Sequence, residues 1–242
     1  LIKWSLSIYP QKKMLPVYDN DCDTRTPLIH LETQIKNKFI LKIYCILSLQ
    51  LFITFLMSLG CYFTNSVRQF VLQQQGVLIS TILLSFLFLI LSLCYGRNYP
   101  CNYVCLFGFT LSESYLVTYI CLFYQPITIL LAWGLTLSIF IILSVYVYYT
   151  KSDFQFLGAG LFASLWILII GGIIQVIWLP RDQLFNTFMA IFGSIIACGY
   201  ILYDTSDILN RLTPDDFIHA CISLYTDIIM LFVRLLELLG DD

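Results

Sequence analysis

The chain has 242 residues, of which 59% are hydrophobic and 12% are charged, and its formal net charge at pH 7 is −2. A soluble domain carries roughly 25% charged residues, so a chain with a mean hydropathy of +0.84 has too few polar groups to cover a globule. This composition predicts a polytopic protein whose partner is the lipid bilayer, and the absence of a basic run argues against nucleic-acid binding.

Residues 1–37 contain three prolines and scattered charges but no long apolar run, and we expect them to form a disordered cytosolic tail. The first residue is Leu1, and Met14 is a plausible true start, which would make residues 1–13 non-native. The tail has no signal-peptide pattern, so the first apolar run is expected to serve as the insertion signal.

Residues 38–242 are predicted to form one transmembrane domain of seven helices, because apolar runs of the length that crosses a bilayer recur along them. In chain order the expected spans are 40–63, 77–95, 101–124, 126–149, 155–179, 184–206 and 216–239. Most connections are only a few residues long, so consecutive helices should be antiparallel neighbours. Glycines in the fifth span indicate close helix packing. The seventh span is the most charged, and a re-entrant segment is the alternative for it.

The distribution of lysine and arginine predicts a cytosolic N-terminus, because basic residues collect on the cytosolic side of membrane proteins. With that orientation, ten basic residues face the cytosol and three face the other side. The ten are Lys3, Lys12, Lys13, Arg25, Lys36, Lys38, Lys42, Arg97, Lys151 and Arg211, and the three are Arg68, Arg181 and Arg234.

The nine cysteines predict neither a disulfide framework nor a zinc site. Most lie inside apolar spans, where cysteine behaves as a small hydrophobic residue, and their spacing includes no CxxC motif. We therefore expect no cofactor.

Three carboxylates lie inside the predicted spans, where an ionised side chain is costly. Glu113 is near the middle of the third span, Asp204 is near the cytosolic end of the sixth, and Asp227 is near the middle of the seventh. For Glu113 alone, a structural hydrogen bond to a neighbouring helix and a place in an ion pathway fit the sequence equally well.

Asp204 and Asp227 are the stronger candidates for function, because a short turn around LTPDD joins their two spans. At about 1.5 Å per residue, their depths agree to within about two turns, which a helix tilt would absorb. Two carboxylates in contact cannot both ionise cheaply, so one keeps a proton and the pair titrates as a unit. The protonated pair would hold the helices together, whereas the ionised pair would repel and attract a cation, which predicts a pH sensor.

Paired intramembrane aspartates also occur in aspartyl proteases of the membrane, in a Tyr-Asp element and a Gly-x-Gly-Asp element. Tyr203 and Asp204 match the first element, but Leu224-Tyr225-Thr226-Asp227 has neither glycine of the second. Without small residues the backbone cannot approach a peptide substrate, so we expect no enzymatic activity.

Several stretches in order along the chain resemble the Bax-inhibitor-1 superfamily and its lifeguard proteins over about residues 36–239. They are LFGFTLSES, KSDFQFLGAGLFASLWIL, YILYDTSDIL and LTPDDFIHACISLYTDIIMLF. One residue departs from the usual pattern: Met230 stands where the family has Asn, which removes a polar group from the last helix.

The resemblance implies an all-α membrane protein with seven transmembrane helices, the last of them central. It further implies a pH-sensitive Ca²⁺ leak from the Golgi or endoplasmic reticulum that inhibits apoptosis by lowering stored Ca²⁺. The family's pH-sensing pair falls on Asp204 and Asp227, which would also be transient Ca²⁺ ligands. Arg97 is the candidate latch for that pair, and Glu113 is the candidate for the ion pathway.

The alternative is a non-conducting interaction protein that regulates death signalling through other membrane proteins of cell death or Ca²⁺ handling. A seven-helix receptor is disfavoured, because the loops and tails offer little surface for a ligand or a G protein. The intramembrane acids favour conduction, because a scaffold has no need of them.

Overall fold

A computed structural model of the protein describes residues 22–63, 68–69, 71, 73–150, 152–177 and 183–240. The chain divides into two units, Leu1–Asn37 and Lys38–Asp242, and the packing described below is that of the second unit. Residues 1–21 of the predicted tail lie outside the described residues, as do Lys3, Lys12, Lys13, Lys151 and Arg181 of the charge count. The described part of the chain is helical and contains no strand.

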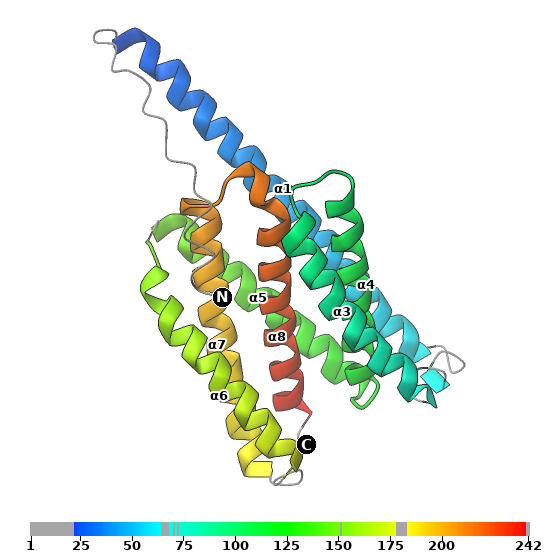
Figure 1. Ribbon diagram of the computed structural model, residues 1–242. Helices are drawn as coiled ribbons and strands as arrows, with labels where there is room; N and C mark the ends of the chain where they lie inside the picture. Colours follow the sequence, from blue (N-terminus) through cyan, green and yellow to red (C-terminus); the bar gives the residue numbers. More distant parts are fainter. Residues whose placement is uncertain are drawn as a thin grey trace. The chain divides into compact units, whose positions relative to one another are not determined.

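The seven predicted spans correspond to seven α-helices among the described residues (Figure 1). They are α1 (Cys22–Phe63), α3 (Gln75–Tyr95), α4 (Cys101–Cys121), α5 (Pro126–Thr150), α6 (Gly158–Ile177), α7 (Gln183–Asn210) and α8 (Phe217–Leu239), with 3₁₀ turns η1 (Gln155–Leu157) and η2 (Pro214–Asp216). Proline fixes its own φ and lacks an N–H, so it is suited to the first turn of a helix. Pro126 begins α5 and Pro214 begins η2, which places the breaks where the sequence predicts them.

The first helix differs from the prediction, because it begins at Cys22 and not near residue 40. Residues 22–37 are therefore helical, although they were expected to belong to a disordered tail. The physical reason lies in their periodicity: Leu28, Leu31, Ile35 and Phe39 recur at intervals of three and four residues, which is the spacing of one helix face. A search for unbroken apolar runs does not detect such a pattern.

The last helix is the centre of the bundle, as the family resemblance implies. Thirteen residues of α8 are buried, among them Tyr225, Leu231 and Phe232, which are completely inaccessible. In Figure 1 α8 lies between α7 on one side and α3 and α4 on the other, and it contacts all three helices as well as α5. At 23 residues and about 1.5 Å per residue, α8 is about 34 Å long, enough to span a hydrocarbon core of about 30 Å. α8 is one uninterrupted helix, but it is not among the described helices that are long and apolar enough to cross a membrane, so its crossing stays a prediction.

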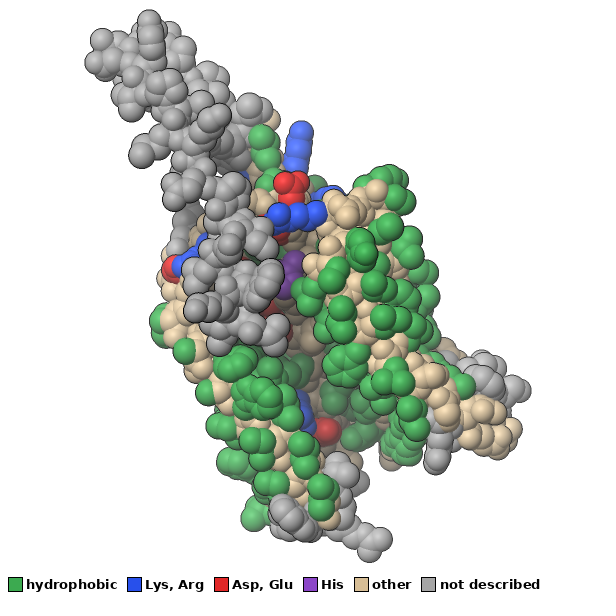
Figure 2. Space-filling view, viewed as in Figure 1, with side chains coloured by type: hydrophobic (Ala, Val, Ile, Leu, Met, Phe, Trp, Pro, Cys, Tyr) green, Lys and Arg blue, Asp and Glu red, His purple; other side chains and the backbone are tan. Residues whose placement is uncertain are grey.

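The helices around α8 turn apolar faces outward. Within the described residues, six helices are long and apolar enough to cross a membrane: α1, α3, α4, α5, α6 and α7. Figure 2 shows many hydrophobic side chains on the described part of this face, as expected where the outer solvent is lipid. The architecture is therefore an all-α membrane bundle of seven helices.

Glycine brings α6 and α7 close together, as the sequence predicts for the small residues of the fifth span. A Cβ atom added at Gly171 would clash with Cε of Met189 on α7. At Gly158 the same atom would meet the Tyr203 ring at 3.1 Å. Gly160 and Gly172, in contrast, have open space around them, so only part of the cluster serves this packing.

Candidate functional site: a carboxyl pair between α7 and α8

The short connection from α7 to α8 places the two helices against each other along their length. The backbone N–H groups of Arg211 and Leu212 both donate to the carbonyl of Asp207, at 2.9 Å and 3.1 Å, and so close the last turn of α7. Pro214 then starts η2, and α8 follows directly at Phe217. The α7–α8 contact is the most extensive between any two described helices, so side chains that face each other across it are firmly positioned.

Asp204 and Asp227 meet across this contact. The two carboxyl groups lie close enough to interact electrostatically, and Asp227 is buried, with only 7% of its surface accessible. Asp227 lies ten residues into α8 and Asp204 six residues before the end of α7, so the tilt of the helices absorbs the difference in depth. Two ionised carboxylates side by side would repel strongly, whereas a proton between them would allow a hydrogen bond. That the pair shares a proton stays a prediction, and a shared proton would remove this repulsion.

One oxygen of the pair is still available to a further partner. Oδ2 of Asp227 is buried and has no hydrogen-bond partner within the described ranges of the chain. A buried carboxyl oxygen without a partner is costly unless it carries a proton or receives a donor or a cation. In this conformation Oδ2 of Asp227 can therefore still bind a proton, a hydrogen-bond donor or a cation.

A small cavity of about 20 Å³ adjoins the pair, which is room for about one water molecule. Its polar lining comes from Asp204, Asp207, His219 and Ser223. His219 acts electrostatically on Asp204, and the Tyr200 side chain lies in the field of both acids while its hydroxyl donates to the carbonyl of Leu161 at 2.9 Å. The carboxyl pair is thus bordered by polar groups at the α7–α8 interface.

Arg97 lies in the loop after α3 and forms an ion pair with Asp216 at the start of α8. Its Nη2 is 2.7 Å from Oδ1 of Asp216, and the Thr213 hydroxyl donates to Oδ2 of the same carboxylate at 2.6 Å. Partial burial alone would raise the pKa of Asp216, but the hydrogen bonds from Thr213 and Arg97 outweigh it and hold that pKa below its usual range. Arg97 therefore binds the beginning of α8 at Asp216, which is eleven residues before Asp227. Its action as a latch on the carboxyl pair stays a prediction.

Glu113 is at the middle of α4 and is engaged with a different helix. The Ser85 hydroxyl of α3 donates a short hydrogen bond to Oε1 of Glu113. This bond matches the structural alternative for Glu113, because it links two neighbouring helices. Glu113 also acts electrostatically on Tyr225 of α8, which places it beside the central helix.

A buried hydrogen-bond network near Glu113 was not anticipated from the sequence. The Thr54 hydroxyl of α1 lies 2.9 Å from the Ser114 hydroxyl of α4 and 2.9 Å from the Tyr225 hydroxyl of α8. One turn away, Nε2 of Gln50 donates to the Thr110 hydroxyl at 2.8 Å. The network therefore ties three helices together at the level of the acid on α4.

A signal for this network is present in the sequence. Polar residues recur every four positions on two apolar helices, which places each set on one helix face. The sets are Gln50, Thr54 and Ser58 on α1, and Thr110, Ser114 and Thr118 on α4. These residues are uncharged, so the cost of burying an ionised group, which singles out the three acids, does not single them out.

The carboxyl pair is not a complete cation site in this conformation. In the portion of the chain with described side chains, no three His, Cys, Asp or Glu side chains converge to hold a metal ion. Because Ca²⁺ takes six to eight oxygen ligands in proteins, two carboxyl groups suit an ion in passage better than a resident one.

The order of these elements along the chain matches a known family. The family described as Inhibitor of apoptosis-promoting Bax1 matches residues 36–242, which is nearly all of the chain after the predicted tail. The chain belongs to this Bax-inhibitor family.

Individual relatives agree with that assignment. Protein lifeguard 4 from Mus musculus is 35% identical over 232 residues, which cover 96% of this chain and 94% of the relative. The Golgi anti-apoptotic protein of Vaccinia virus (strain Lister) is 35% identical over 222 residues, covering 91% and 92%. Bax inhibitor 1 of Schizosaccharomyces pombe is 35% identical over 216 residues, covering 89% and 80%. The resemblance to the lifeguard branch predicted from the sequence motifs is thereby confirmed.

Met230, which departs from the usual family pattern, has a packing role in this Bax-inhibitor family member. Its side chain is partly buried against both hydrophobic clusters of the bundle, the large one around α8 and a smaller one formed by Leu161, Leu168, Met189 and Ile196. Methionine is flexible enough to fill such an irregular junction, so the position joins α8 to the α6–α7 pair through apolar contact.

Proposed function

We propose that this chain is a pH-sensitive Ca²⁺-leak channel of Golgi or endoplasmic reticulum membranes, which lowers stored Ca²⁺ and thereby inhibits apoptosis. The names of two relatives, Golgi anti-apoptotic protein and Bax inhibitor 1, support the cell-death role, and the first supports the compartment. The proposal involves no enzymatic step and no cofactor, and Ca²⁺ is the permeating ion.

The contact between Asp204 and Asp227 is the observation that carries this proposal. The two side chains are on consecutive helices and lie close enough to interact, and a shared proton would let them hydrogen-bond. Loss of that proton would leave two negative charges in contact in a medium of low dielectric constant, where their repulsion is strong. The repulsion would drive α7 and α8 apart and at the same time create a site that attracts a cation.

The sign of the pH dependence follows directly. Acidification favours the shared proton and hence the closed contact, so the leak should fall as the cytosolic pH falls. Alkalinisation removes the proton and should increase the leak. The cavity lined by His219 and Ser223 adjoins the pair on the side of the α7–α8 turn, which the predicted orientation assigns to the cytosol.

Glu113 would be a second point of attraction for a cation on its way through the bundle. It lies beside the hydrogen-bond network of Thr54, Ser114 and Tyr225, whose hydroxyl oxygens are suitable partners for water or Ca²⁺. With the predicted cytosolic N-terminus and seven spans, the end of α8 lies on the lumenal side.

Ca²⁺ efflux from liposomes that contain only the purified protein tests the proposal. We expect an efflux above that of protein-free liposomes, which decreases as the pH of the compartment facing the α7–α8 turn is lowered from 8 to 6. If there is no efflux at any pH while expression of the same protein still protects cells from apoptosis, the function is that of a non-conducting interaction protein.

A further inference from the structure

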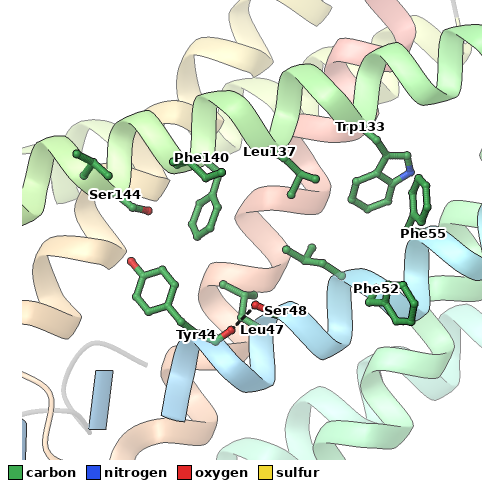
Figure 3. A pocket seen from close by; sticks show the side chains of 12 residues that line it. Tyr44, Leu47, Ser48, Phe52, Phe55, Trp133, Leu137, Phe140 and Ser144 are labelled. Carbon is green, nitrogen blue, oxygen red and sulfur yellow. Dashed lines mark hydrogen bonds between the residues drawn. The ribbon is translucent and has the colours of Figure 1, made fainter. Parts of the chain in front are cut away.

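A second feature of the bundle lies apart from the carboxyl pair: an apolar pocket of about 540 Å³ between α1 and α5 (Figure 3). This volume is within the range of small-molecule sites in proteins, about 300–1,000 Å³. Leu47 and Phe140 form part of its buried wall, whereas Phe52 and Ile141 are more than half exposed at its rim. The pocket therefore opens on the outer surface of the bundle, where lipid surrounds the protein.

The two ends of the pocket differ in chemistry. At one end the hydroxyl of Tyr44 faces the hydroxyl of Ser144 (Figure 3). The Ser144 hydroxyl is buried and makes no hydrogen bond among the residues the structure describes, and the Tyr44 hydroxyl lies beside both Ser144 and Thr205 without satisfying either. A buried hydroxyl without a partner is costly. This end is therefore ready to hydrogen-bond one polar group of a ligand.

The opposite end is aromatic. Trp133 stacks on Phe232 of α8 with ring centroids 4.3 Å apart and meets Phe55 edge to face at 5.9 Å. Figure 3 shows the indole nitrogen beside the Phe55 ring, and this buried N–H has no hydrogen-bond partner among the described residues. From Trp133 to Ser144 the helix rises eleven residues, or about 16 Å. The pocket thus has two facing hydroxyl groups at one end and an aromatic wall with a single indole N–H at the other.

We propose that this pocket binds a membrane sterol, with the sterol hydroxyl at Tyr44 and Ser144 and its ring system lying along Leu47, Leu137 and Phe140. The aromatic wall suits a rigid fused-ring lipid, and a sterol hydroxyl, which can both donate and accept, suits the two facing hydroxyl groups of Tyr44 and Ser144. None of the twelve lining residues is charged, so the site offers no partner for the phosphate of a phospholipid or the carboxylate of a fatty acid. The source of the ligand is the bilayer, because the pocket opens toward lipid.

Photolabelling of the full-length protein in nanodiscs tests the proposal. The probe is a cholesterol analogue with a diazirine in its ring system, and the labelled peptides are identified by mass spectrometry. We expect labels on peptides of α1 and α5 that contain residues 44–55 and 133–145. Unlabelled cholesterol should compete for this labelling at least tenfold better than 5-cholestene, which has the same rings but no hydroxyl.

Two kinds of variant sharpen the test. Leu137→Trp fills the pocket from a partly exposed position and should reduce labelling at least tenfold, whereas Leu135→Trp, on the same helix but outside the pocket, should leave it unchanged. Removing a hydroxyl in Ser144→Ala or Tyr44→Phe should weaken cholesterol competition about three- to tenfold, the loss expected for one hydrogen bond. Size-exclusion profiles and thermal unfolding verify that each variant is folded.

The proposal is overturned by any of three results. Labelling that is equal in Leu137→Trp and Leu135→Trp would place the sterol elsewhere. Equal competition by cholesterol and 5-cholestene would remove the role of the polar end. If a phospholipid with a diazirine in its acyl chain labels the same peptides and cholesterol does not displace it, the occupant is an acyl chain and not a sterol.

Discussion

Removal of the Tyr225 hydroxyl tests how strongly the buried network ties α8 to the helices around it. Tyr225 has no accessible surface, and its hydroxyl lies 2.9 Å from that of Thr54 on α1. Thr54 in turn donates to the carbonyl of Gln50 and contacts Ser114, so it joins α1, α4 and α8 at one point. Tyr225→Phe removes one hydroxyl from this point and leaves the ring packing in place. Thr54→Val removes the Thr54 hydroxyl, which contacts Gln50, Ser114 and Tyr225.

The expected magnitudes follow from what each change leaves unpaired. In Tyr225→Phe, Thr54 keeps its other two partners. The free energy of unfolding should therefore fall by about 0.6–1.7 kcal/mol, the average and the maximum measured for side-chain hydrogen bonds between membrane helices. In Thr54→Val, the buried Tyr225 hydroxyl loses its partner on α1, so the free energy of unfolding should fall by about 1–3 kcal/mol. The double variant should cost less than the sum by about 0.6 kcal/mol, because both changes break the same bond.

The assay is the free energy of unfolding in bicelles, measured by steric trapping, for both single variants and the double variant. Tyr149→Phe is the matched control, because Tyr149 is 78% exposed and loss of its hydroxyl should change the stability little. If Tyr225→Phe is no more destabilising than Tyr149→Phe, or if the two changes are strictly additive, the hydrogen bond contributes nothing and the network does not hold α8.

Three further predictions concern single features. Arg97→Gln should destabilise the fold at neutral pH by less than about 1 kcal/mol, because Arg97 is largely exposed. Since its partner Asp216 has a lowered pKa, the difference in melting temperature from the wild type should persist at pH 7, shrink as the pH falls below the unfolded pKa of about 3.9, and vanish once Asp216 is protonated in the folded protein as well. Glu113→Gln keeps the shape of the side chain and should lower the Ca²⁺ leak severalfold in liposomes; an unchanged leak from a folded variant would leave Glu113 with only its structural bond to Ser85. An N-terminal tag should be digested by protease added outside sealed Golgi or endoplasmic reticulum vesicles, and protection of the tag would overturn the cytosolic N-terminus.

Much of the helical framework is predictable because it depends on local properties of the chain. The apolar runs locate the spans, and Pro126 and Pro214 mark the breaks before α5 and α8, since proline cannot continue a helix. The long N-terminal extension of α1 was missed because its apolar residues are spaced along one face and do not form a run. The central position of α8 came from the family resemblance, and the burial of Tyr225 and Phe232 agrees with it.

The site was predictable only where charge made the residues conspicuous. Asp204 and Asp227 stand out because an acid in an apolar span is costly, and the short turn between their helices implies that they meet. The partner of Arg97 depends on how each helix is rotated about its own axis, which periodicity alone does not determine. The same is true of the hydrogen bonds that the Thr54 hydroxyl makes. Ser85 and Glu113, for example, are on helices whose relative rotation becomes known only from the packed structure.

The measurement that tests the central claim most directly is Ca²⁺ leak against pH in liposomes for the wild type, Asp204→Asn, Asp227→Asn and the double variant. The exposed acid Asp215, in the turn between the helices, supplies the control Asp215→Asn. The account predicts that the wild-type and control leaks fall on acidification, that each single variant has a low leak without pH dependence, and that the double variant adds little to either. A wild-type leak that ignores pH, or single effects that add in the double variant, would show that Asp204 and Asp227 act independently and would contradict the proposed gate.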